Sequence, residues 1–111
     1  MWNENDQMME LLEGIEHENV AVPTKCPVCG KTQAHYFFHI ANETSGKGTA
    51  WIWCDGCKSY SHFSYFIPKW WKNPEFVDIG ELDSSIAYPR SIEKEIDDWA
   101  NALISRSNPN A

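Results

Sequence analysis

Two short runs of sequence decide the fold: Cys26-Pro27-Val28-Cys29-Gly30 and Cys54-Asp55-Gly56-Cys57. Each is a C-x2-C pair, and the 24 residues between the pairs are enough for a β-hairpin that brings the pairs together. A glycine beside the second cysteine of each pair supplies the positive φ that such a tight turn needs. Four soft thiolates gathered in this way form the tetrahedral donor set that zinc prefers. The sequence therefore predicts one structural Zn²⁺ ion, bound by all four cysteines of the chain: Cys26, Cys29, Cys54 and Cys57.

Three other uses of the cysteines fit the sequence less well. Disulfides suit a secreted chain, but Met1–Asp6 has neither the basic nor the apolar region of a signal peptide. A redox C-x-x-C normally stands alone near a βαβ pattern, which is not visible here. A nucleobase deaminase needs H-x-E before P-C-x-x-C, whereas His17 is followed directly by Glu18, and Pro27 follows Cys26. Four thiolates also close the coordination sphere, so we expect a structural zinc in a cytoplasmic protein.

The order C-P-x-C-G, hairpin and C-x-G-C resembles the zinc ribbon family, with its rubredoxin-like pair of cysteine knuckles, over about residues 24–66. The resemblance implies a three-stranded antiparallel ribbon with the four cysteines binding the ion at one end. The second knuckle departs from rubredoxin, since it has Asp55-Gly56 in place of Pro-x and Lys58 in place of Gly. Zinc is therefore favoured over iron, and electron transfer is disfavoured. Zinc ribbons bind nucleic acids, bind other proteins or simply stabilise a fold, so this resemblance implies no particular function.

Runs rich in β-favouring aromatic and branched residues predict the three strands of this ribbon, and the third run also alternates between its two faces. The first covers residues 35–41, a polar turn covers 42–49, the return strand covers 50–53, and the third strand covers 59–66. Because successive side chains of a strand point to opposite faces, three apolar residues of the first strand share one face: Tyr36, Phe38 and Ile40.

Helical periodicity predicts a helix on each side of the ribbon. The N-terminal helix lies within residues 1–19, over 3–16, and its apolar stripe is Met8, Leu11, Leu12 and Ile15. The C-terminal helix covers 91–106, with Ser91 as N-cap. Its apolar stripe is Ile92, Ile96, Trp99, Leu103 and Ile104. We therefore expect one α+β domain over residues 1–111, in which an aromatic and acidic connector, 67–90, joins the ribbon at 24–66 to the second helix.

The net charge of −7 is unevenly distributed along the chain. Residues 24–72 carry six lysines against two acids, a balance of +4, whereas the flanks carry fourteen acids against three bases, a balance of −11. Proteins that grip nucleic acid usually show a basic stripe. An acidic field instead repels phosphate and attracts basic proteins. No apolar run approaches the roughly 20 residues of a membrane span. A basic protein partner is therefore favoured over nucleic acid, and a membrane is disfavoured.

The candidate partner surface combines aromatic and acidic residues: Trp70, Trp71, Glu93, Glu95, Asp97 and Asp98, extended by Glu75, Asp78, Glu81 and Asp83. Two adjacent tryptophans in an extended stretch cannot both point inward, so we expect one to pack in the core and the other to cover the sheet or meet a partner. Tryptophan is enriched at interface hot spots, although a core role is favoured in a small aromatic domain. For the acids, a solvated helix face is the commoner role. The ribbon, the Trp-Trp segment and the acidic helix together also resemble small bacterial immunity proteins. The sequence thus favours a non-enzymatic zinc-binding interaction module, in its most concrete form an inhibitor that covers a basic nuclease toxin. The alternative is a nucleic-acid accessory factor, with Lys69 and Lys72 beside the tryptophans.

The histidines and the motif content give no indication of catalysis. His39 and His62 are predicted on neighbouring strands, and a structural role is favoured for both because no carboxylate lies at a usable spacing. His17 and His35 belong to no pattern. The sequence has neither a Gly-rich phosphate loop nor a nucleophile elbow. We therefore expect neither an active site nor a small-molecule substrate.

Overall fold

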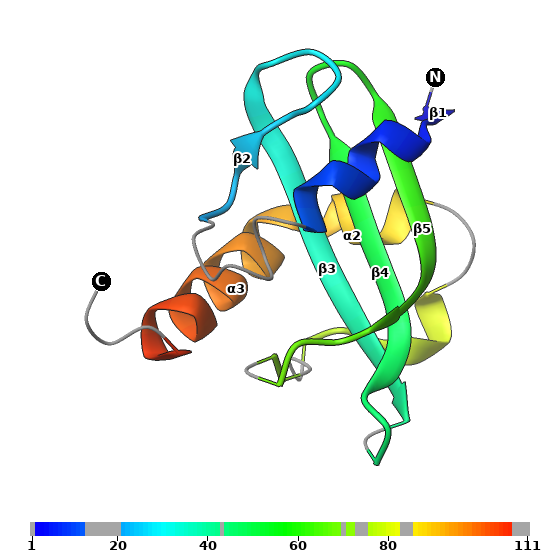
Figure 1. Cartoon of the computed structure of the whole chain (residues 1–111), viewed down its shortest axis with the longest axis vertical. Coiled ribbons are helices and arrows are strands. Elements are labelled where there is room, and N and C mark those ends of the chain that lie inside the picture. Colours follow the sequence, from blue (N-terminus) through cyan, green and yellow to red (C-terminus); the bar gives the residue numbers. More distant parts are fainter. Residues whose placement is uncertain are drawn as a thin grey trace.

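The computed structural model describes residues 2–12, 21–42, 44–69, 71–72, 76–82 and 86–107. Its centre is a five-stranded mixed sheet in the order β1-β5-β4-β3-β2 (Figure 1). The strands are β1 Asn3–Glu4, β2 Thr24–Lys25, β3 Thr32–Asn42, β4 Lys47–Cys54 and β5 Ser59–Phe66. All neighbours are antiparallel except β1 and β5, which are parallel. The fold is α+β, and its three long strands lie where the β-favouring runs of the sequence predict them.

The predicted three-stranded antiparallel ribbon is nevertheless wrong, because a short strand extends the sheet at each edge. Asn3 and Glu4 of β1 pair with β5, and Thr24 and Lys25 of β2 pair with β3. An edge strand of two residues is held by main-chain hydrogen bonds, which need no alternation of apolar side chains. A pattern of side chains therefore cannot reveal it.

The predicted N-terminal helix over 3–16 is also wrong. Residues that it would use are paired with the sheet instead: Asn3 N donates to Lys58 O, and Asn5 N donates to Tyr60 O, each at 2.8 Å. The chain then forms η1, a short 3-10 helix over Asp6–Glu10, whose first turn is capped by the Asn5 side chain. Met8 and Leu12 are buried, as the apolar stripe requires, whereas Ile15 lies outside the described residues.

Both faces of the sheet are covered, which explains why Ala34–Phe38 is buried without interruption. Figure 1 shows η1 on one side of the sheet and the two C-terminal helices on the other. The helix α3, Glu93–Ser107, lies against the face that carries His35, because Asp97 of that helix hydrogen-bonds the imidazole. Strand alternation places Tyr36 on the opposite face, toward η1.

The C-terminal segment forms two helices, α2 Ala87–Ser91 and α3 Glu93–Ser107, preceded by the 3-10 turn η2 Ile79–Glu81. Ser91 is not an N-cap: it ends α2, and its hydroxyl donates to Tyr88 O at 2.7 Å. The predicted stripe does pack on the core, since Ile96 and Leu103 are buried. None of the helices in the described ranges has the length and apolar character that crossing a bilayer requires.

Candidate metal centre

Two tight turns at one end of the sheet present the four cysteines. In the first turn, Gly30 N donates to Cys26 O at 2.9 Å, and Gly30 has φ of 79°. In the second turn, Lys58 N donates to Cys54 O at 3.0 Å, and the positive φ belongs to Lys58, at 59°. The expectation that a glycine supplies this conformation is therefore confirmed for Gly30 and is wrong for Gly56. Lys58 occupies the position at which rubredoxin-like knuckles have glycine.

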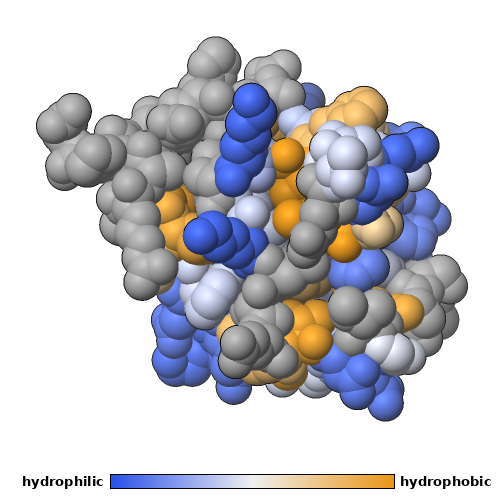
Figure 2. Space-filling view, turned by 90° about the horizontal axis from the view of Figure 1, so that it is seen from below, coloured by the Kyte–Doolittle hydropathy of each residue, from blue (hydrophilic) through white to orange (hydrophobic). Residues whose placement is uncertain are grey.

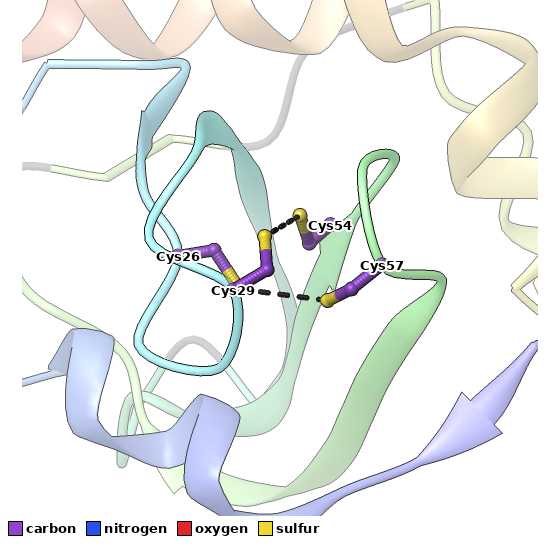
Figure 3. Close-up of side chains that lie close together, drawn as sticks. All are labelled: Cys26, Cys29, Cys54 and Cys57. Atoms are coloured by element: carbon purple, nitrogen blue, oxygen red, sulfur yellow. Dashed lines mark hydrogen bonds between the residues drawn. The ribbon is translucent and has the colours of Figure 1, made fainter.

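The four sulfur atoms lie where a tetrahedral ion needs them (Figure 3). The Sγ atoms of Cys26 and Cys57 are 3.7 Å apart, as are those of Cys29 and Cys54, and all four lie within 4.8 Å of one another. A zinc ion with bonds of about 2.3 Å to four tetrahedral sulfurs separates neighbouring sulfurs by about 3.8 Å. The residues therefore fit a single ion at their centre, and one cysteine of each turn faces a cysteine of the other.

Main-chain donors and η1 surround this centre. Val28 N donates to Cys26 Sγ, and Gly56 N donates to Cys54 Sγ, each at 3.3 Å. Such donors stabilise thiolate over thiol. Above the first turn, Met8 Sδ lies 3.8 Å from Cys26 Sγ, and Gln7 Nε2 donates to Pro27 O at 2.9 Å. The 3-10 helix thus covers the first cysteine turn. The predicted N-terminal helix was expected only to flank the ribbon.

The surroundings treat the four thiols differently. Burial raises the pKa of the Cys54 thiol to about 12, and it also raises the pKa of Cys26. Burial raises the pKa of the Cys57 thiol, but hydrogen bonds with Ser59, Cys26 and Cys29 together lower it by more, so that this pKa falls to about 7. A coordinated divalent ion deprotonates a thiol outright and overrides these differences. The chemistry of this donor set is the binding of a metal ion that favours soft thiolate ligands.

The predicted partner residues occupy different places in the structure. Trp71 is 3 % exposed and packs edge-on against Phe37 and Phe38, so it belongs to the core. Glu93 and Asp97 turn inward toward His35. Four of the predicted acids are exposed: Asp78, Glu81, Glu95 and Asp98. The remaining three residues lie outside the described part of the chain: Trp70, Glu75 and Asp83.

The structure also changes the reading of the histidines. His39 lies on β3 and His62 on β5, and β4 lies between them, so the prediction that the two histidines lie on neighbouring strands is wrong. His35, which belonged to no pattern, instead contacts three carboxylates, on Asp55, Glu93 and Asp97. One signal was available in the sequence: His35 directly precedes the apolar run of β3, and a buried polar side chain needs a partner. Its partners could not be named, because Asp97 lies 62 residues further along the chain.

Comparison of the chain with family models, with curated proteins and with solved structures found no match in any of the three.

Proposed function

We propose that this protein is a zinc-stabilised, non-enzymatic interaction module. The observation that carries the proposal is the cluster of four cysteine sulfurs, each within 4.8 Å of the others. Four thiolates complete the coordination of one zinc ion and leave no position for a substrate, which favours a structural role. The ion then joins the turn before β3 to the turn between β4 and β5, so that it braces the sheet rather than performing a reaction.

The partner that we propose is a basic protein, and the module is then an inhibitor of the immunity type. Support comes from the acidic flanks, because carboxylates on a surface speed association with a basic partner and select it. Exposed carboxylates in the described residues occur near the N-terminus, in the connector and on α3: Glu4, Asp6, Glu10, Asp78, Glu81, Glu95 and Asp98. Since Glu93 and Asp97 face His35, the acidic surface on α3 is reduced to Glu95 and Asp98.

Affinity capture from host lysate, with and without nuclease treatment, tests this proposal. We expect one basic protein to be retained after nuclease treatment. The double substitution Glu95→Lys with Asp98→Lys should weaken its binding at least about tenfold, because each reversed charge repels a basic surface. The double substitution Glu4→Lys with Glu10→Lys is the matched control for net charge, since it also reverses two exposed acids but lies outside α3. Equal affinity of wild type and the double variant would exclude the α3 surface.

A second candidate, nucleic-acid binding, is favoured by one observation. A hollow of about 760 Å³ lies between the β3–β4 turn and the segment after β5, and Phe66, Lys69 and Lys72 line part of it. Phe66 is 69 % exposed. Figure 2 views the molecule from that end and shows hydrophobic atoms at the surface between hydrophilic ones. An exposed aromatic ring beside lysines is suited to stacking on a base while the lysines neutralise phosphate.

Single-stranded oligonucleotides at low salt separate the two candidates. If nucleic acid is the partner, affinity should fall as salt rises, and Phe66→Ala should weaken binding by about 1–3 kcal/mol while Glu95→Lys does not. Lys69→Ala should also weaken nucleic-acid binding. Lys25→Ala is its matched control, because both lysines are exposed but only Lys69 lines the hollow. The absence of any oligonucleotide binding at low salt would exclude this candidate.

A further inference from the structure

A second group of potential metal ligands lies around His35, outside the four-cysteine centre. The imidazole has Nδ1 at 2.7 Å from Asp97 Oδ2, and Nε2 at 3.1 Å from Asp55 Oδ2 and 3.8 Å from Glu93 Oε2. These residues come from three elements: His35 from β3, Asp55 from the second cysteine turn, and both Glu93 and Asp97 from α3. His35 and Asp97 are 7 % and 8 % exposed, so the fold holds these two side chains in place.

The contact with Asp97 determines what the other imidazole nitrogen can do. A carboxylate only accepts hydrogen bonds, so Nδ1–H donates to Asp97. In a neutral imidazole, Nε2 then carries the lone pair, and it faces Asp55 and Glu93. This is the carboxylate–histidine arrangement that orients imidazole ligands in metalloproteins. One nitrogen and two carboxylate oxygens therefore converge on one point, and the three ligand atoms lie within 4.8 Å of one another.

The carboxylates around His35 are incompletely satisfied. Glu93 Oε2 and Asp97 Oδ1 are buried and have no hydrogen-bond partner within the described residues. Buried oxygens of this kind are rare, because each costs about 1–3 kcal/mol when no donor or ion compensates for lost water. A cation beside Glu93 Oε2, which lies 3.8 Å from His35 Nε2, would remove that cost at this atom.

The charged groups around His35 also have a net negative charge, which favours a bound cation. Three carboxylates face two cations: Arg90 Nε lies 3.0 Å and Lys58 Nζ 3.9 Å from Asp55 Oδ1. With a neutral imidazole the group has a balance of −1, and either a proton on Nε2 or a metal ion at that position compensates it. Access is open on one side, because the side chains of Asp55 and Glu93 are 20 % and 33 % exposed.

We propose that His35 Nε2, Asp55 and Glu93 form a second divalent-metal site, with Asp97 as the positioning residue that fixes the imidazole. A set of one imidazole nitrogen and two carboxylate oxygens suits borderline ions such as Zn²⁺, Co²⁺, Fe²⁺ and Mn²⁺. Three protein ligands leave further coordination positions to water. The site therefore differs in chemistry from the closed four-thiolate centre and can exchange its ion.

The test starts from protein that contains one zinc ion per chain and adds cobalt chloride. We expect one further equivalent to bind, with a spectrum that lacks thiolate-to-cobalt charge transfer. Glu93→Gln should weaken this binding at least about tenfold, and Asp97→Asn should weaken it by about 10–100-fold, as is usual for a group that orients a metal-bound histidine. Glu95→Gln is the matched control, because it changes an exposed acid on the same helix.

A second measurement needs no variant and so does not depend on whether one folds. Cadmium-113 NMR of protein loaded with two equivalents of cadmium should show two resonances, one typical of four sulfur ligands and one typical of nitrogen and oxygen ligands. Nitrogen-15 shifts of His35 should change at Nε2 and not at Nδ1. The proposal is overturned by a single cadmium resonance, by cobalt that binds only with thiolate bands, or by wild-type affinity in Glu93→Gln.

Discussion

Replacing one zinc ligand tests whether the metal holds the fold together, and Cys29→Ser is the informative substitution. The side chain is only partly buried, so a serine fits without an empty space in the core. Structural zinc contributes about 10–16 kcal/mol to the folding of finger peptides, so four equal ligands would contribute roughly 2.5–4 kcal/mol each. A domain of this size has a total stability of about 5–15 kcal/mol. Loss of one ligand should therefore remove a large share of the folding free energy.

Two measurements on the same samples give the answer. We expect wild type to retain one zinc per chain and Cys29→Ser to retain less, with a urea midpoint that corresponds to a loss of at least about 2.5 kcal/mol of folding free energy. Val28→Ser is the control, because Val28 lies between the same two cysteines and its side chain is exposed. A zinc-free Cys29→Ser protein with the wild-type urea midpoint would refute the reasoning that the ion stabilises this sheet.

Three further predictions concern stability. Burial lowers the pKa of His35 less than Asp97, Glu93 and Asp55 raise it. In protein with one zinc per chain, the ion pairs of His35 should stabilise the fold fully at pH values below the ordinary histidine pKa of about 6.5. This stabilisation should be lost as the pH rises through the raised pKa of His35 in the folded protein. In urea titrations at a series of pH values, Asp97→Asn should lower the free energy of unfolding by about 3 kcal/mol at acidic pH and by less at alkaline pH. A loss of stability that is the same at every pH would contradict this prediction. Gly48→Ala should cost about 3 kcal/mol in the same assay, because the added Cβ would overlap the carbonyl of His39, and wild-type stability would exclude that close approach. Lys58→Gly should be more stable than Lys58→Ala by about 1 kcal/mol, since only alanine retains the strain of a φ near 59°, and the reverse order would refute the assigned backbone conformation.

The parts of the structure that could be predicted are those in which neighbouring residues carry the signal. A C-x2-C pair indicates a tight turn within four residues, and the two pairs together predicted the cluster of four cysteines. The β-favouring runs of β3, β4 and β5 and the stripe of Ile96 and Leu103 likewise come from residues close in sequence. These strand and helix patterns extend over several residues and are therefore hard to produce by chance.

The remaining parts depend on contacts between distant residues. The edge strand β1 forms because the backbone of Asn3 pairs with Lys58, and no property of residues 1–10 alone indicates this. The carboxylates of α3 looked like a solvated or partner-binding face, but two of them turn toward His35, on a strand about sixty residues earlier. A pattern along one helix shows which side chains share a face, and only the tertiary fold shows which neighbour that face meets.

The two proposed sites share one structural element, and this makes their relationship testable. Asp55 immediately follows Cys54, so the turn that presents Cys54 and Cys57 to the first ion also presents a carboxylate to the second. An ion at either site restrains this turn, so each should raise the affinity of the other. Coupling between two binding sites is reciprocal and is typically about 1–3 kcal/mol, or about 5–150-fold. Chelator competition for the four-cysteine zinc should therefore show tighter binding in the presence of cobalt, and Glu93→Gln should abolish that effect while Glu95→Gln keeps it. Zinc affinity that is independent of cobalt, in protein that does bind a second equivalent, would show that the shared turn does not transmit the restraint.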